Sequence, residues 1–167
     1  FGTYDRVIAR VYFAVDPRLP ANRDIPDIEH APTNDFGRVE FASDLVFLRP
    51  KPGRANGAVL IEPVNRGLEQ SLFVFSGAQQ RDRAPASWTL GDNFLLDQGF
   101  TLAFFGWQFD VSREDGLAFD APTAPVRGVV REAYIELKRD ERIIDFSLKY
   151  CADAATADGA TLTYRAK

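Results

Sequence analysis

Two short segments of the sequence combine glycine with hydrogen-bond donors directly after an apolar run. Asn65, Arg66 and Gly67 follow the run 58–64, and residues 106–110 (Gly-Trp-Gln-Phe-Asp) follow the run 100–105. Backbone N–H groups freed at such a corner can stabilise a developing oxyanion, and losing one donor costs about 3 to 4 kcal/mol in acyl-transfer enzymes. The two segments therefore indicate anion binding during acyl transfer.

A purely structural interpretation explains the same residues. Asn65 and Gly67 would accept left-handed backbone angles, Arg66 would be a solvated charge, and Trp107 would belong to the core. Short spacings of this kind are unspecific, so both interpretations stay open at this point.

The elements expected to position these corners are two strands with a helix between them. The run 58–64 is almost wholly apolar, which predicts a strand covered on both faces, as in parallel sheets. Asp92 can cap a short helix that Gly99 ends, and the run 100–105 predicts a second buried strand. Strand, helix and strand in this order predict a parallel βαβ unit around 58–106, within the region 57–110. Ligands of open α/β sheets bind beyond the carboxyl ends of parallel strands, where both corners lie.

Antiparallel β structure is predicted on both sides of this unit. In the region 1–50, two strand-like runs, 7–15 and 39–47, flank a long loop rich in Pro, Asp and Asn, and the second run contains a bulge near 42–44. In the region 126–165, apolar and polar residues alternate over 144–150, which is typical of a half-buried strand. The fold class expected is α/β with β-rich flanks, in a single domain or in the N-terminal part of a larger one.

Composition and charge exclude several classes of partner. The fractions of hydrophobic and charged residues are ordinary for a soluble globular protein, and the formal net charge of -4 argues against nucleic acid, whose phosphates need a basic face. The apolar runs are far shorter than the roughly 18 residues of a membrane span. Cys151 is the single cysteine, so no internal disulfide is expected, and no zinc-ligand spacing surrounds it. No glycine-rich phosphate-binding pattern occurs, and no cofactor or metal is expected.

A family resemblance is carried by five stretches: DPRLPANRDIPDIEHAPTNDFGRVEF, FLRP, VLIEPVNRG, GDNFLLDQGFTLAFFGWQFDV and TLTYR. They resemble the N-terminal half of a large family described only as alpha/beta hydrolase domain proteins. The resemblance covers nearly the whole chain, and NRG together with QGF and GWQ.D are its most specific parts. It implies a partial α/β-hydrolase-like sheet in which 58–64 precedes the oxyanion loop. It places Asn65, Arg66 and Gly67 on that loop, and Trp107, Gln108 and Asp110 at the rim of the substrate site.

The catalytic triad of that fold is not found in the sequence. Its nucleophile stands in a Gly-x-Ser-x-Gly motif, and a histidine follows later. No such motif is present; we interpret Ser76 as a surface or turn serine, and His30, the single histidine, precedes every candidate serine. The expected function is the N-terminal portion of a serine carboxylic-ester hydrolase whose nucleophile and histidine lie outside this chain. Its expected partners are a small-molecule ester and the C-terminal half of the same protein, and the chain alone is predicted to be inactive.

Two other functions remain as alternatives. The chain would be a non-catalytic mixed-β binding or interaction module if Phe104, Phe105 and Trp107 formed an aromatic ligand surface. It would bind a metal ion or a glycan if the acidic loop 24–35 gathered its oxygen ligands, although no EF-hand spacing is present. Glu62, the single carboxylate in its apolar run, is expected to pair with Arg66 or another arginine, or to lie at a solvated edge.

Overall fold

The structure is a computed structural model that describes residues 4–79, 83–126 and 161. The chain separates into two units, 1–125 and 126–167, and the helices and strands given below belong to the first. The antiparallel extension predicted over 126–165 lies outside the described residues, apart from residues 126 and 161. Cys151 also lies outside them.

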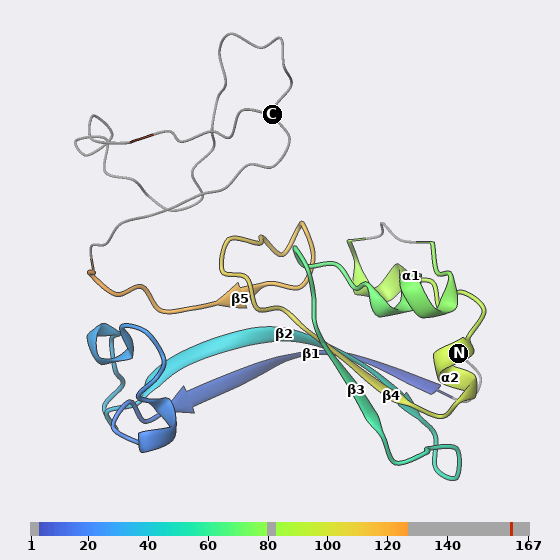
Figure 1. The fold of residues 1–167 in the computed structure, drawn as a ribbon, viewed down its shortest axis with the longest axis horizontal. Helices are drawn as coiled ribbons and strands as arrows, with labels where there is room; N and C mark the ends of the chain where they lie inside the picture. Colours follow the sequence, from blue (N-terminus) through green and yellow to red (C-terminus); the bar gives the residue numbers. More distant parts are fainter. Residues whose placement is uncertain (1–3, 80–82, 127–160, 162–167) are drawn as a thin grey trace, which may run out of the picture. The chain divides into compact units, whose positions relative to one another are not determined.

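One mixed sheet contains five strands (Figure 1). Strands β1 (Tyr4–Val15) and β2 (Val39–Pro50) are antiparallel along their whole length. Strand β4 (Thr101–Phe105) is antiparallel to β2, and β3 (Val59–Pro63) lies beyond it, which makes the order β1-β2-β4-β3. The short β5 (Phe119–Asp120) pairs with β2 where β4 has ended.

Strands β3 and β4 are parallel, in a register from Val59 opposite Thr101 to Pro63 opposite Phe105. The predicted parallel pairing of the runs 58–64 and 100–105 is therefore confirmed. The other pairings in the sheet are antiparallel and the helices are short, so the described part is mostly β with one parallel pair. The structure therefore confirms the parallel pair, but it does not show the α/β-hydrolase-like sheet that was predicted around it.

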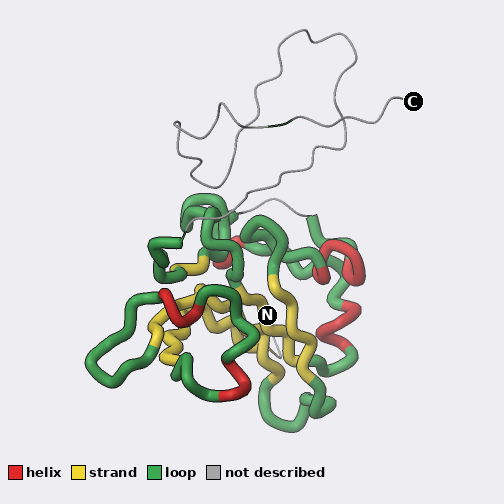
Figure 2. The backbone as a smooth tube through the Cα atoms, turned by 60° about the vertical axis from the view of Figure 1, so that its left-hand side comes forward, coloured by secondary structure: helices red, strands yellow, loops and turns green. Residues whose placement is uncertain are grey.

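The connection from β3 to β4 carries two short helices, α1 (Ser71–Ser76) and α2 (Phe94–Asp97), which contact each other. The described residues also contain 3₁₀ turns at Pro20–Asn22, Ile28–His30 and Pro85–Ser87 (Figure 2). The predicted helix near 92–99 exists as α2, with Asp92 Oδ1 accepting the Phe94 N–H at 3.0 Å. Helix α1 was not predicted. Its last residue, Ser76, is buried, so the interpretation of Ser76 as a surface serine is wrong.

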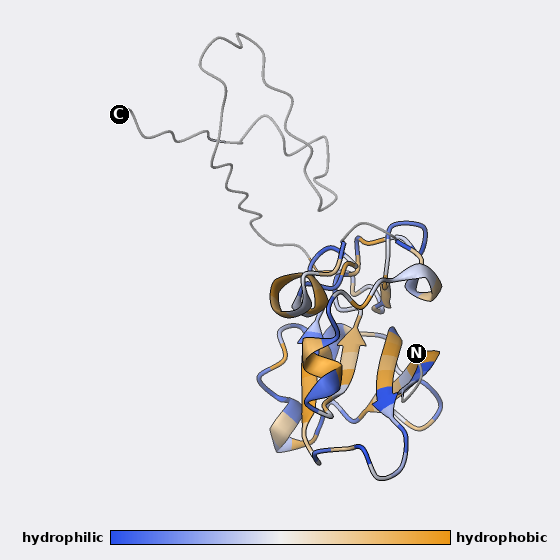
Figure 3. Ribbon diagram, turned by 90° about the vertical axis from the view of Figure 1, so that its right-hand side faces the viewer, coloured by the Kyte–Doolittle hydropathy of each residue, from blue (hydrophilic) through white to orange (hydrophobic). Residues whose placement is uncertain are grey.

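The core lies between one face of the sheet and this helical connection. Leu72 of α1 and Leu95 of α2 pack against sheet residues such as Leu102 and Phe104, and Trp88 meets the Phe104 ring edge-on at 5.3 Å between centroids. Figure 3 shows apolar strands next to polar loops in this part of the chain. The exposed side chains of α1, Phe73 to Phe75, point away from the core.

Two details of the sheet differ from the sequence-based expectations. Strand β3 is not covered on both faces, since Val59 and Ile61, which share one face, are exposed at 54% and 65%. The bulge predicted near 42–44 is absent, since the register of β1 and β2 runs without interruption from Tyr4 opposite Pro50 to Val15 opposite Val39.

Candidate functional site

The turn after β3 has an unusual backbone conformation. The Leu68 N–H donates to the Asn65 carbonyl at 3.1 Å, and the two residues between them have positive φ, 52° at Arg66 and 79° at Gly67. A type I′ turn has positive φ at both central positions. The left-handed region costs a residue with a side chain about 1 to 2 kcal/mol, so the conformation of Arg66 depends on contacts that hold it.

Those contacts come from the corner after β4. Arg66 Nη1 forms an ion pair with Asp110 Oδ1 at 2.7 Å, and the Arg66 N–H donates to Gln108 Oε1 at 2.5 Å. Trp107 Nε1 donates to the Val64 carbonyl at 2.7 Å. The parallel register explains why the two segments meet, because Pro63 lies opposite Phe105 and both strands end at the same edge of the sheet. We call Asn65, Arg66, Gly67, Trp107, Gln108 and Asp110 the corner.

The corner partly overturns the purely structural interpretation of its residues. Arg66 pairs with Asp110 although its side chain is 42% exposed, and Trp107 is 55% exposed rather than in the core. Gly67 has the expected left-handed angle, whereas Asn65 is not among the described residues with positive φ. Asn65 is exposed and takes part in the turn through its backbone carbonyl.

The back of the turn is closed by the loop that precedes β5. The Leu117 N–H donates to the Gly67 carbonyl at 2.9 Å. A Cβ at Gly67 would lie 2.8 Å from Val111 Cγ1 and 3.0 Å from Gly116 Cα. Glycine is therefore required at position 67 for two reasons, the backbone angle and the close approach of this loop.

Residues of β2 that the sequence did not mark as functional hold the second half of the corner. Ser43 Oγ donates to the Gly106 carbonyl at 2.6 Å, and the Gly106 N–H donates to the Asp44 carbonyl at 3.0 Å. Asp44 Oδ1 also pairs with Arg10 at 2.9 Å. In the sequence, Ser43 and Asp44 stand out as a polar interruption of the second strand. We interpreted this interruption as a bulge and not as a contact with the corner.

No arginine of the described residues pairs with Glu62, so the first of the two expectations is wrong for that part of the chain. Strand β3 ends the strand order, which agrees with the second expectation, a solvated edge. The Glu62 carboxylate accepts the N–H groups of Gln70 at 2.6 Å and Ser71 at 2.9 Å, together with the Ser71 hydroxyl. These are donors at the start of α1, which a helix leaves without internal partners. Glu69 is buried nearby. Burial raises the pKa of its carboxyl, and the charge of Glu62 raises it further.

Neither Ser76 nor His30 stands where a triad member would. Ser76 ends a helix instead of joining a strand to a helix, and its buried Oγ has no hydrogen-bond partner among the described residues. His30 lies in a 3₁₀ turn of the loop, where its side chain is 54% exposed and Nε2 is 3.9 Å from Glu29 Oε1. Both positions agree with the absence of a nucleophile elbow from the sequence.

The two alternative sites lose support. Within residues 4–79 and 83–126, no three side chains of His, Cys, Asp or Glu come together to hold a metal ion. The expected aromatic surface is incomplete because Phe104 is fully buried, although Trp107 and its neighbour Phe109 are both more than half exposed. Two cavities formed by described residues contain no residue of the corner among their linings.

Comparisons of the chain with protein-family models, with curated proteins and with solved structures found no match. Within the described part of the chain, no helix combines the length and the apolar character that crossing a bilayer requires.

Proposed function

We propose that this chain supplies the oxyanion-loop side of a serine carboxylic-ester hydrolase with an α/β-hydrolase-like sheet, as the family resemblance implies. The nucleophile and the histidine would come from sequence outside this chain, because the chain has no Gly-x-Ser-x-Gly motif and no histidine after a candidate serine. The substrate would be a small-molecule ester.

One observation carries the proposal. Two segments about 40 residues apart in the sequence meet beyond the carboxyl ends of the parallel pair β3 and β4, and Arg66 joins them through both its backbone and its side chain. Ligands of α/β sheets bind at such an edge. The left-handed conformation of Arg66 also needs these contacts, as strained backbone at functional sites commonly does.

The chemistry of the corner suits a developing negative charge. In the structure Gln108 Oε1 accepts the Arg66 N–H. A glutamine amide carries both an acceptor and a donor, so moving this side chain away from Arg66 would free the N–H for an anion and leave the Nε2 donor beside it. The ion pair with Asp110 neutralises the Arg66 side chain, which leaves such uncharged donors to hold an oxyanion.

The test is esterase turnover on short acyl esters. The 167-residue chain should show none, while a longer protein that joins it to a Gly-x-Ser-x-Gly segment and a later histidine should hydrolyse them. In that protein Gln108→Leu should lower kcat about a hundredfold. The control Glu114→Gln, at an exposed loop position, should leave kcat unchanged. Turnover by the purified chain alone would disprove the placement of the nucleophile, and full activity of Gln108→Leu would disprove the role of the corner.

A second candidate function is a non-catalytic ligand-binding module. The exposure of Trp107 and Phe109, at 55% and 53%, favours it, because two large aromatic side chains next to a polar corner resemble a binding surface. Phe104 does not belong to this binding surface, because it is fully buried. An inactive longer protein whose Trp107 fluorescence responds to added esters would support binding without hydrolysis.

A further inference from the structure

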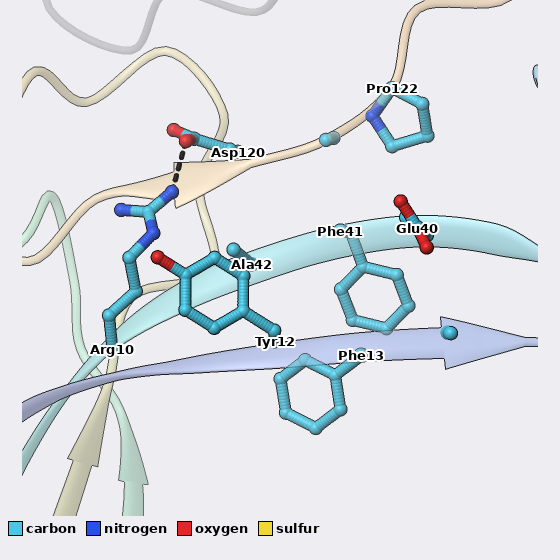
Figure 4. Close-up of a pocket in the computed structure, with 10 residues that line it drawn as sticks. Arg10, Tyr12, Phe13, Glu40, Phe41, Ala42, Asp120 and Pro122 are labelled. Atoms are coloured by element: carbon cyan, nitrogen blue, oxygen red, sulfur yellow. Dashed lines mark hydrogen bonds and ion pairs between the residues drawn. The ribbon is translucent and has the colours of Figure 1, made fainter. Parts of the chain in front are cut away.

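A surface cavity lies along the β1 and β2 pair, and no residue of the corner lines it (Figure 4). Its volume is about 500 Å³, and it is a shallow groove that is widely open to solvent. The lining comes from three segments: Arg10 and residues 12–14 of β1, residues 40–42 of β2, and residues 120–122 at and after β5. A second cavity of about 220 Å³ shares Glu40 and Pro122 with it, so Glu40 stands where the two meet.

Strand alternation groups the side chains that line this cavity. Tyr12 lies opposite Ala42 and Ala14 opposite Glu40, so these four side chains share one face of the sheet. Asp120 also lies opposite Ala42. The Phe13 and Phe41 rings alternate with these side chains along the strands and stack with centroids 4.8 Å apart, and both residues also line the cavity. Two alanines therefore form a small apolar floor, with the Tyr12 ring and Pro122 beside it (Figure 4).

The charges around the cavity are unequal. Arg10 pairs with Asp44 and with Asp120, and Arg113 also pairs with Asp120 at 2.8 Å, so these two arginines and two aspartates balance one another. Glu40 accepts a hydrogen bond from Asn34 Nδ2 at 2.6 Å, and no cation pairs with it within the described ranges. The excess charge of the cavity is negative and is concentrated at Glu40.

We propose that this cavity binds a small organic cation, an ammonium group that carries an apolar substituent. The ammonium would pair with Glu40, and the substituent would lie on Ala14 and Ala42 against the Tyr12 ring, whose face also attracts cations. Arg10 already lies 5.7 Å from the centre of that ring. An anion would have to break the pairs of Arg10 and Arg113. The proposal does not depend on the ester-hydrolase function.

Binding of three compounds of the same size to the full 167-residue chain tests the site: 2-phenylethylamine, 2-phenylethanol and 3-phenylpropionate. Because Glu40 and Tyr12 are exposed, we expect a Kd for the amine on the order of 1 mM. Binding is measured by the changes in the NMR chemical shifts of the backbone amides. The shifts should concentrate on residues 12–14 and 40–42. The alcohol should bind about tenfold more weakly, and the carboxylate should not bind measurably.

Two variants and a control separate this site from unspecific binding. Glu40→Gln keeps the shape and should weaken amine binding about tenfold, to the level of the alcohol. Ala42→Leu should fill the floor and abolish binding of both compounds. Glu114→Gln removes an exposed carboxylate that lines neither cavity and should change nothing. Equal affinity for amine and alcohol, an unchanged Kd in Glu40→Gln, or shifts spread over the whole sheet would each overturn the proposal.

Discussion

The corner and the loop that connects β1 to β2, residues 16–38, look alike in the sequence but are held together differently. Both are rich in charged residues and turn residues. At the corner, Arg66 binds Gln108 and Asp110, which lie 42 and 44 residues further along the chain. In the connecting loop, Asn34 Oδ1 accepts the N–H groups of Phe36 and Arg38, two and four residues away.

This difference in the sequence separation of partners distinguishes a site from a loop. A local network closes wherever the chain bends, whereas the corner forms only when β3 and β4 pair. The backbone angles of the two regions show the same difference between local and distant partners. Asp27 in the loop has a positive φ of 58°, which Asp tolerates because its short polar side chain can bond locally. The long Arg66 side chain forms no local hydrogen bond of this kind, so its backbone angle is maintained by its distant partners.

The largest expected effect comes from adding a methyl group at each region's glycine. Gly67→Ala meets Val111 and Gly116 within 3.0 Å and also keeps a positive φ, so we expect a loss of about 3 kcal/mol in the free energy of unfolding. Gly37→Ala in the loop has a similar φ of 69°, with no neighbour closer than 3.9 Å. It should cost about 1 kcal/mol, from the backbone alone.

Urea denaturation of both variants measures the two losses. Equal losses would mean that the loop before β5 moves aside for the new methyl group, and the corner would then be no more tightly built than the connecting loop. This result also bears on the ester-hydrolase test, because an unstable Gly67 variant cannot report on catalysis. Gln108→Leu serves better there, since Gln108 is only half-buried.

A smaller effect is expected from removing one arginine in each region. In Arg66→Met the Asp110 carboxylate, 19% exposed, loses its neutralising guanidinium, and Arg66 loses a contact that holds its left-handed angle. We expect a cost of about 1 to 2 kcal/mol by urea denaturation. Arg18→Met breaks the exposed pair with Asp16, which should produce no measurable change. A larger loss in Arg18→Met than in Arg66→Met would reverse the comparison.

Local patterns were sufficient to predict the parallel pair and that the segments 65–67 and 106–110 follow it at one edge of the sheet. Apolar runs that end in glycine and polar residues mark strand ends, and the carboxyl ends of parallel strands share an edge. The partners of Arg66 were not predictable, because its pairing with Asp110 depends on the register of β3 and β4.

Other errors have the same origin in long-range contacts. The exposure of Val59 and Ile61 depends on what packs against that face of β3, which composition does not reveal. Helix α1 was missed because its residues, Ser-Leu-Phe-Val-Phe-Ser, include β-branched and aromatic types of modest helix propensity. Its start is satisfied by Glu62, a residue of the preceding strand.

The smallest expected effect is the pH dependence of stability, which has opposite signs in the two regions. Burial, then the charge of Glu62, raises the pKa of Glu69, beside the corner, above its ordinary 4.5. A carboxyl with a raised pKa stabilises the fold fully below its unfolded pKa and loses this contribution as the pH rises through the folded pKa. Glu69→Gln carries no charge at any pH, so its stability relative to the unchanged chain should rise above about pH 4.5.

Asp16 in the connecting loop should behave in the opposite way. Hydrogen bonds from Arg18 lower the pKa of its carboxyl to about 2, so its contribution is present above 3.8 and is lost as the pH falls through about 2. Asp16→Asn should therefore lose stability relative to the unchanged chain only above that range, by a small amount because the pair is solvated. Urea denaturation from pH 3 to pH 8 measures both differences. If the Glu69→Gln difference fell with rising pH, as for Asp16→Asn, the Glu69 carboxyl would be stabilised in its charged form by the N–H groups at the start of α1, and its burial would not govern its titration.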